Sequence, residues 1–367
     1  MIRLPEKIRR TLERLVNGLQ KKESVYGIGL FGSWSRGDAA PSSDVDLLIV
    51  DRDLIDEEFV ERLVVGGLHV DLDHVPKKWI CDVIPPSLDQ KLYEMQILYD
   101  RDWSLTNSKM LMTKPYGSAD RVQIRTEAHV VDSDIYLSRA TSTFARGDYR
   151  SGCLFASTAT ESVFRVLVEI AMVPFSNSHA MECLESSTTK LGMHDRFNRF
   201  LETSRLCGAE SAKDKLKLFK TISNEFSATI KRRPHELKQA QFKVRSNLDY
   251  CLNPDFQHGM IMRTSALIDS DRMIEALHYM SGVLMEIIQN SVWLRSSTGK
   301  ARVDSSILMR SLENLEEKNP RNYKQVVEFL NLDNVEKNDA TRAIKETRET
   351  MRVVRRNRKA LIEKHLS

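Results

Sequence analysis

A glycine–serine pair and two closely spaced acidic residues form the first chemically suggestive pattern in this sequence. Gly32 and Ser33 end one apolar stretch, and Asp44 and Asp46 open the next. Side chains at positions i and i+2 of a strand point to the same face, about 6.6 Å apart along it. Two carboxylates held in this way can bind a hard divalent cation such as Mg²⁺ together with nucleotide phosphates. The spacing therefore predicts metal-assisted phosphate chemistry.

A third acidic position follows on a later apolar stretch, where Asp71 lies between Val70 and Leu72. Asp73 shares its face, so either residue could supply the third carboxylate. Three carboxylates around one or two metal ions are required for in-line phosphoryl or nucleotidyl transfer, because the ions neutralise charge that develops during the reaction. Without a metal, adjacent carboxylates repel one another and some hold protons.

The glycine–serine turn offers the matching contacts to phosphate. A glycine lets the backbone come close to a ligand, and amides exposed at a turn or helix start cradle phosphate oxygens. Ser33 adds a hydroxyl, and Arg36, one turn further on, adds a charge-assisted contact. Gly32, Ser33 and Arg36 are therefore the predicted triphosphate-binding residues.

This order of motifs resembles the polymerase-beta-type nucleotidyltransferase superfamily, and within it the minimal and the kanamycin-type antibiotic nucleotidyltransferases. The likeness rests on segments 31–38 and 43–50 and on the later Asp71, and it covers residues 24–100. It implies transfer of a nucleoside monophosphate from a nucleoside triphosphate to an acceptor, with two Mg²⁺ ions.

The resemblance also assigns roles to individual residues. It places the triphosphate on Gly32 and Ser33, and the metals and the catalytic function on Asp44, Asp46 and Asp71, with Asp73 as the other register for the third acid.

Two competing phosphate-binding patterns are less consistent with their surroundings. The Gly-x-Gly-x-x-Gly spacing at 27–32, with Asp51 as a ribose-binding acid, matches a dinucleotide site. Its glycines would lie within the first strand, however, and the segment that follows is too broken for a crossover helix. Residues 297–300 resemble the end of a triphosphatase loop, but Leu294 stands where a glycine is required, so we expect an interhelical turn there.

Apolar periodicity predicts a small mixed sheet around these motifs. We expect short strands and helices over the first hundred residues: a helix at 5–21, strands at 25–31, 44–50, 67–75 and 96–100, a charged helix at about 54–64 and a short helix at 77–84.

From residue 121 the sequence becomes helix-periodic and poor in strand signals. We expect helical segments near 121–146, 150–172, 211–231, 234–251, 264–294, 304–317, 320–331 and 335–365. The predicted fold class is α+β, with a nucleotidyltransferase domain at 1–105, an all-α helical bundle at 121–295 and a helical C-terminal extension with a basic end at 300–367.

One glutamate of the helical part is a candidate for a catalytic role. Segment 147–165 resembles the helical domains that partner these transferases, some of which supply a glutamate as general base. Glu161 is the residue to which the resemblance points, whereas a surface ion pair with Arg165 four positions later is the commoner role for such a glutamate.

Charge and cysteine usage narrow the class of protein. The first 103 residues carry five more acidic than basic side chains, and the remainder carries nine more basic than acidic ones. This asymmetry favours metal-binding or catalytic carboxylates in the first 103 residues and a polyanion or acidic partner for the remainder. The alternative is that the basic residues form solvated helix faces. Five scattered cysteines without a CxxC pair argue against a disulfide framework or zinc cluster. With no bilayer-length apolar run and no visible signal peptide, we expect a cytoplasmic protein without membrane contact.

The sequence therefore predicts an Mg²⁺-dependent enzyme that moves a nucleoside monophosphate from a triphosphate to a hydroxyl of a small molecule, a protein or an RNA end. The alternative is a nucleotide-binding regulatory or antitoxin-like module that senses nucleotide without turnover. The base preference and the oligomeric state, including a homodimer, are left open.

Overall fold

The computed structural model describes residues 4–40, 43–54, 56–206, 212–298, 306–317 and 320–366. Contacts between Cα atoms divide the chain into two compact units. The first, here the sheet unit, comprises Met1–Ser118 and Ser246–Arg263; the second, here the helical unit, comprises Ala119–Arg245 and Thr264–Ser367. The α+β fold class is confirmed, because a five-stranded mixed sheet with helices is followed by a mostly helical region.

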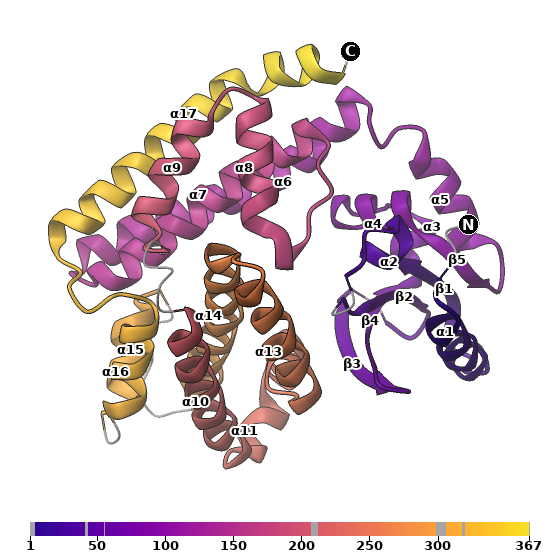
Figure 1. Cartoon of the computed structure of the whole chain (residues 1–367), viewed down its shortest axis with the longest axis horizontal. Helices are drawn as coiled ribbons and strands as arrows, with labels where there is room; N and C mark the ends of the chain where they lie inside the picture. The colour runs from indigo at the N-terminus through magenta and orange to yellow at the C-terminus, as the bar shows by residue number, and fades with distance from the viewer. Residues whose placement is uncertain are drawn as a thin grey trace. The chain divides into compact units, whose positions relative to one another are not determined.

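The N-terminal part of the sheet unit alternates short strands and helices (Figure 1). Its elements are α1 (Glu6–Leu19), β1 (Val25–Phe31), α2 (Gly32–Arg36), β2 (Val45–Asp51), β3 (Phe59–Val65), β4 (Leu68–Pro76), α3 (Lys77–Cys81), η1 (Pro86–Leu88), α4 (Asp89–Glu94), β5 (Gln96–Asp100) and α5 (Ser104–Thr113).

The five strands form one sheet in the order β3-β4-β2-β1-β5. Strands β2 and β4 are parallel, whereas β1 is antiparallel to both β2 and β5, and β3 is antiparallel to β4. The central strand β2 has the burial pattern of a strand covered on both faces, with a continuous apolar run from Leu47 to Val50.

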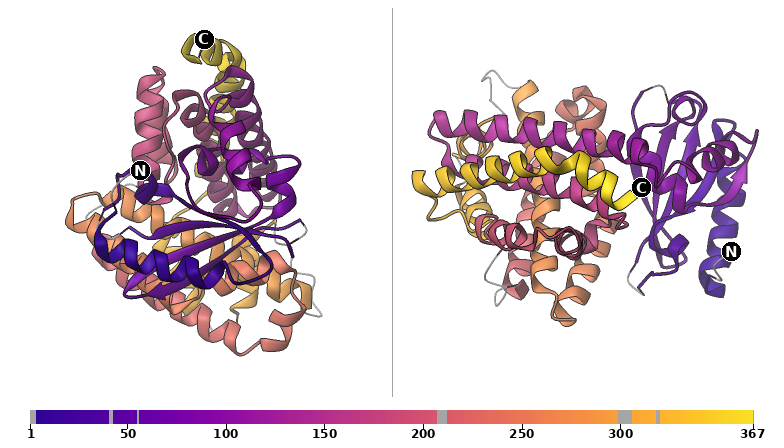
Figure 2. Two further views of the ribbon diagram at one scale, coloured as in Figure 1. Left: turned by 90° about the vertical axis from the view of Figure 1, so that its right-hand side faces the viewer. Right: turned by 90° about the horizontal axis from the view of Figure 1, so that it is seen from above.

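The sheet lies between two helical layers. On one face, α1 packs its buried Leu12 and Val16 against side chains such as Ile28 and Leu47. Figure 2 shows α1 running across that face. On the other face, α3, α4 and α5 cover Leu48 and its neighbours. The two apolar layers fix the sheet, and with it the polar side chains at the strand ends.

The charged helix expected at about 54–64 is wrong. Phe59–Val65 forms β3, an edge strand that pairs with β4 through a hairpin at Gly66 and Gly67. Both glycines have positive φ, 60° and 78°, which a tight two-residue hairpin requires and which glycine adopts without a steric cost. Charged side chains on an edge strand are common, because they discourage pairing with other chains, and here they obscured the strand pattern.

The described residues after α5 are mostly helical. Their elements are α6 (Ala119–Ala145), α7 (Tyr149–Ala171), η2 (Asn177–His179), α8 (Ala180–Lys190), α9 (His194–Thr203), α10 (Ala212–Lys231), α11 (Pro234–Gln239), α12 (Phe242–Cys251), α13 (Pro254–Asp269), α14 (Met273–Thr298), α15 (Leu308–Leu315), α16 (Pro320–Phe329) and α17 (Lys337–Leu366).

Within the helical unit, the long helices α6, α7 and α17 pack along one another, and α10 packs against α14 and α16. Two segments predicted as single helices are divided, 234–251 into α11 and α12, and 264–294 between α13 and α14. The turn expected at 297–300 lies partly in α14, which extends to Thr298, and its last two residues are outside the described residues. No helix in the described ranges is both long and apolar enough to cross a bilayer.

One helical segment from the middle of the chain belongs to the sheet unit. Residues Ser246–Arg263, which include the end of α12 and most of α13, pack with the sheet rather than with the bundle. The two helices meet at a short turn, where the Asn253 side chain accepts a hydrogen bond of 2.8 Å from the Asp255 amide, and Pro254 is the first residue of α13. The three domain ranges given by the sequence stay predictions.

Candidate active site

The two central parallel strands bring acidic side chains together. Asp46 in β2 is the register partner of Asp71 in β4, and Asp44 immediately precedes β2. Register partners on neighbouring strands project their side chains to the same face, and so do residues two apart on one strand. The sheet thus gathers Asp44, Asp46 and Asp71 on one face at the start of β2.

The glycine–serine turn lies against this group. Gly32 starts α2 directly after β1, with a φ of 73°, and its neighbour Phe31 is the register partner of Asp46. A Cβ atom on Gly32 would collide with a carboxylate oxygen of Asp46. Glycine is therefore required at this position both for its backbone conformation and for the close approach of the turn to the carboxylate.

A carboxylate from α4 accepts a hydrogen bond from the amide at this turn. The Gly32 amide donates a hydrogen bond of 2.7 Å to Glu94, and the Arg36 guanidinium donates one of 2.8 Å to the other oxygen of the same carboxylate. Ser35 also donates its hydroxyl proton to the main-chain oxygen of Glu94. Two of the predicted triphosphate-binding residues, Gly32 and Arg36, therefore hold an anionic group of the chain itself.

Two arginines form ion pairs with Asp44 and Asp71 of the acidic group. Arg62 of β3, whose side chain is 2% exposed, lies 2.7 Å from Asp44 and 2.5 Å from Asp71. Arg263 of α13 lies 2.5 Å from the same oxygen of Asp44. Sequence reasoning missed both, since Arg62 lay in the segment expected to be helical and Arg263 is far along the chain. The signal for Arg62 was the Gly66–Gly67 pair, which is typical of a tight hairpin between two strands and makes Arg62 the register partner of Asp71.

Tyr250, near the end of α12, completes the contacts of Asp71. Its hydroxyl donates a hydrogen bond of 3.0 Å to Asp71 Oδ2, and Arg62 Nη2 lies 3.4 Å from the same hydroxyl. The tyrosine ring packs on Phe256, with ring centroids 4.4 Å apart. No local sequence signal connects this tyrosine to the acids.

The crowding of carboxylates alters their acidity. Burial, followed by the charges of Asp71 and Asp44, raises the pKa of Asp46 well above its ordinary value. Burial also raises the pKa of Asp71 to about 7, although Arg62 opposes the shift. Burial alone would raise the pKa of Asp44, but Arg263 and Arg62 together lower it. The group therefore has a deficit of positive charge centred on Asp46.

Asp73, the other candidate for the third acid, is held differently. Its register partner on β2 is Leu48, and its carboxylate lies 2.6 Å from the ammonium group of Lys91. Burial would lower the pKa of Lys91, but the charge and hydrogen bond of Asp73 raise it, so the lysine keeps its positive charge. Asp73 is thus engaged by a lysine, whereas Asp71 faces Asp46.

The residue types of the acidic group suit Mg²⁺. Carboxylate oxygens are its preferred ligands, Asp44 Oδ1 is buried without a hydrogen-bond partner, and a cation would relieve the repulsion around Asp46. Across the described ranges, no three histidine, cysteine or acidic side chains are already arranged as metal ligands. In the state observed, Arg62 and Arg263 supply the positive charge.

Glu161 lies on α7 in the helical unit. Its carboxylate is 3.1 Å from His278 of α14, and this contact, together with Arg165, lowers the pKa of Glu161 despite the burial that opposes it. The guanidinium of Arg165 lies over the ring of Phe175, 3.2 Å from its centroid. The role of Glu161 as a general base stays a prediction.

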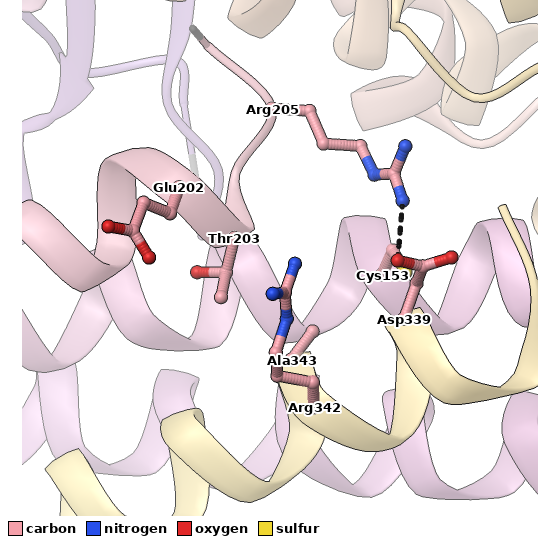
Figure 3. A pocket seen from close by; sticks show the side chains of 7 residues that line it. All are labelled: Cys153, Glu202, Thr203, Arg205, Asp339, Arg342 and Ala343. Carbon is pink, nitrogen blue, oxygen red and sulfur yellow. Dashed lines mark ion pairs between the residues drawn. The ribbon is translucent and has the colours of Figure 1, made fainter. Parts of the chain in front are cut away.

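The helical unit also contains a separate small cavity of about 280 Å³ (Figure 3). Arg205 points toward Asp339, with which it forms an ion pair of 3.3 Å, and Arg342 lies beside them. Cys153 is among the lining residues, and burial raises the pKa of its thiol to about 11, so it is protonated and a poor nucleophile at neutral pH. The four described cysteines are free thiols.

Comparison with known proteins finds a family match within the first hundred residues. Residues 12–98 match the model of a family described as nucleotidyltransferase domain. Among solved structures, a nucleotidyltransferase-like protein from Exiguobacterium sibiricum aligns over 85% of this chain and 91% of its own, with 13% sequence identity and a TM-score of 0.33. No curated protein matches the chain.

Proposed function

We propose, on the match of residues 12–98 to the model of a nucleotidyltransferase domain, that the chain is an Mg²⁺-dependent enzyme. It transfers a nucleoside monophosphate from a nucleoside triphosphate to a hydroxyl group. The acceptor classes are a small molecule, a protein side chain and an RNA end.

The observation that carries this proposal is the meeting of three elements at the start of β2. Asp46 and Asp71 are register partners on adjacent parallel strands, and the Gly32 turn lies so close to Asp46 that no side chain fits between them. The Gly32 amide, a group of the type that binds phosphate, thereby lies next to the Asp46 carboxylate, and a metal-bound triphosphate would need both kinds of group.

In the proposed reaction the Gly32 amide, the Ser33 hydroxyl and Arg36 bind the triphosphate. Glu94 must release the Gly32 amide and Arg36 before they can do so, because it occupies both. Asp44, Asp46 and Asp71 would hold Mg²⁺, which would offset the negative charge of the phosphates and favour ionisation of the acceptor hydroxyl. Asp71 receives the acceptor proton, and its hydrogen bond with a hydroxyl of the chain itself supports that role.

The second candidate function is nucleotide sensing without turnover. The observation that favours it is the neutralisation of Asp44 and Asp71 by Arg62 and Arg263, which places protein cations where the proposed enzyme needs metal. In that case the fold would bind nucleotide and signal its presence through the released arginines.

Transfer assays distinguish the two functions. Each of the four α-labelled triphosphates is incubated with Mg²⁺ and a panel of hydroxylated small molecules, protein and RNA ends, and both labelled product and pyrophosphate are measured. The proposal expects product from the wild type and a loss of at least about a hundredfold in Asp46→Asn. Asp53→Asn, which changes an exposed aspartate beyond β2, is the matched control and should keep the wild-type rate. Nucleotide binding without product or pyrophosphate release for any acceptor would favour the sensing function.

Separate replacement of Asp71 and Asp73 tests which of them is the third acid of the site. Asp71→Asn should reduce transfer about as strongly as Asp46→Asn, because Asp71 shares its register, whereas Asp73→Asn should cost roughly tenfold or less. Melting temperatures of both variants show whether either effect reflects loss of the fold. A larger loss of activity in a folded Asp73→Asn would reassign the third ligand to Asp73.

A further inference from the structure

One of the groups that contact the carboxylates is the hydroxyl of Tyr250, a candidate acceptor for the nucleotidyl group. Tyr250 Oη lies 3.0 Å from Asp71 Oδ2 and donates its proton to it. Building on the proposed transferase function, we propose that Tyr250 is itself a nucleotidyl acceptor, so that the chain modifies its own phenolic hydroxyl.

The turn between α12 and α13 fixes the position of this tyrosine. Tyr250 lies one residue before the end of α12, and the Asn253 cap and Pro254 start α13 immediately afterwards. The Gln257 side chain bonds the main-chain oxygen of Cys251 and so ties α13 back to the end of α12. A residue fixed by a capped turn loses little further freedom when it reacts, which favours transfer within one molecule.

Contacts with Phe256 and Arg62 hold the Tyr250 ring beside the acidic group. Phe256 packs against the tyrosine ring, and the Arg62 guanidinium lies 5.9 Å from the ring centroid of Tyr250 and 5.4 Å from that of Phe256. Tyr250 is nevertheless partly exposed, so the residue is not sealed in a core.

The electrostatic environment also suits a phenol that loses its proton. Arg62 Nη2 lies 3.4 Å from Tyr250 Oη, and a fixed positive charge at that distance stabilises negative charge that develops on the oxygen. Asp71 provides the oxygen that takes the proton. Arg62 thus stabilises the charge on the oxygen, and Asp71 accepts its proton.

The step balances without an additional reagent. Tyr250 Oη attacks the α-phosphorus of the nucleoside triphosphate, the Oη–phosphorus bond forms, and the bond between the α-phosphorus and the bridging oxygen breaks. Pyrophosphate leaves, the phenolic proton passes to the Asp71 carboxylate, and the product is a nucleotidyl-tyrosine phosphodiester.

The experiment incubates the full-length protein with each α-labelled triphosphate and Mg²⁺ without any acceptor, and maps the label by peptide mass spectrometry. We expect one nucleoside monophosphate on the peptide that contains Tyr250, and a labelling rate per molecule that stays constant when the protein is diluted about tenfold, since the reaction is intramolecular. Tyr250→Phe should lower labelling by at least about tenfold. Tyr93→Phe, which removes an exposed phenol of the same unit, should not.

Mapping the wild type keeps the test independent of whether Tyr250→Phe folds. Label on other residues, or no label from an enzyme that does release pyrophosphate with acceptors of the panel, would overturn the inference and leave the proposed function standing. A wild type that neither labels itself nor transfers to any acceptor would overturn both.

Discussion

The amide of Gly32 donates a hydrogen bond of 2.7 Å to the carboxylate of Glu94. Glu94 lies at the end of α4, and its second carboxylate oxygen accepts a bond from Arg36. An amide at a turn and a guanidinium are the groups that bind phosphate, so Glu94 holds the position of an anionic ligand. A triphosphate must therefore compete with a carboxylate of the chain for its binding groups.

Glu94→Gln should bind nucleoside triphosphate about three to ten times more tightly than the wild type, because the amide keeps the shape of the side chain and removes its charge. Calorimetric titration with the triphosphate preferred in the transfer screen measures the dissociation constant. Glu23→Gln, which changes an exposed residue before β1, is the control and should leave it unchanged. Weaker binding by Glu94→Gln would show that Glu94 instead positions Arg36 for the ligand.

Gly32→Ala should cost at least about 2 kcal/mol in the free energy of unfolding, because the alanine would adopt a left-handed φ and its Cβ would collide with Asp46. Urea denaturation measures the loss. Gly18→Ala, in α1, is the matched control, since no atom outside the neighbouring backbone of its own helix lies within 4 Å of the added methyl group. It should leave the stability unchanged or raise it by up to about 1 kcal/mol. Equal stabilities of the two variants would contradict the collision.

The sheet and its glycine–serine turn could be predicted because their signals are local. The apolar run of β1 between turn-forming residues gives Val25–Phe31 as observed, and β5 likewise agrees at both ends. Edge strand β3 was not recognised in the same way, since Glu61 and Arg62 interrupt its apolar residues, and the Gly66–Gly67 pair that follows was the remaining signal. The error concealed Arg62, the register partner of Asp71.

The remaining contacts of the candidate site arise from tertiary packing that no local pattern encodes. Tyr250 reaches Asp71 across 179 positions, and Glu94 reaches the Gly32 amide across 62. Helical periodicity predicts that α12 and α13 are helices, but it does not indicate which apolar surface they cover. The residues that could bind metal were thus predictable by type and spacing, whereas the arginines that neutralise them were not.

Arg62→Gln should destabilise the protein by about 3–5 kcal/mol in a chelator, because it leaves the buried Asp71 without its cation and Asp44 with Arg263 alone. Excess Mg²⁺ should recover part of this loss if the carboxylates bind it, since the ion replaces the missing charge. Thermal melts with and without Mg²⁺ test both statements. Arg14→Gln, on the exposed side of α1, is the control. An equal loss under both conditions would mean that these acids do not bind the ion.

Asp46 should make the stability of the metal-free protein depend on pH. Its pKa is raised well above the 3.8 of an ordinary aspartate, chiefly by burial and then by Asp71 and Asp44. Between the unfolded and the folded pKa, the folded protein holds a proton that the unfolded chain has released. The stability that this proton contributes is complete below the unfolded pKa and is lost as the pH rises through the folded pKa.

Asp46→Asn removes this titration and keeps the shape of the side chain. In a chelator it should match the wild type near pH 4 and exceed it by about 1 kcal/mol or more near pH 8, as measured by urea denaturation across that range. Mg²⁺ should narrow the difference at pH 8, because the ion stabilises the ionised wild-type site and gains little from the amide. A wild type that is more stable than Asp46→Asn at pH 8 in chelator would show that Arg62 and Arg263 already compensate the charge of Asp46, which would also weaken the argument for a metal at this position.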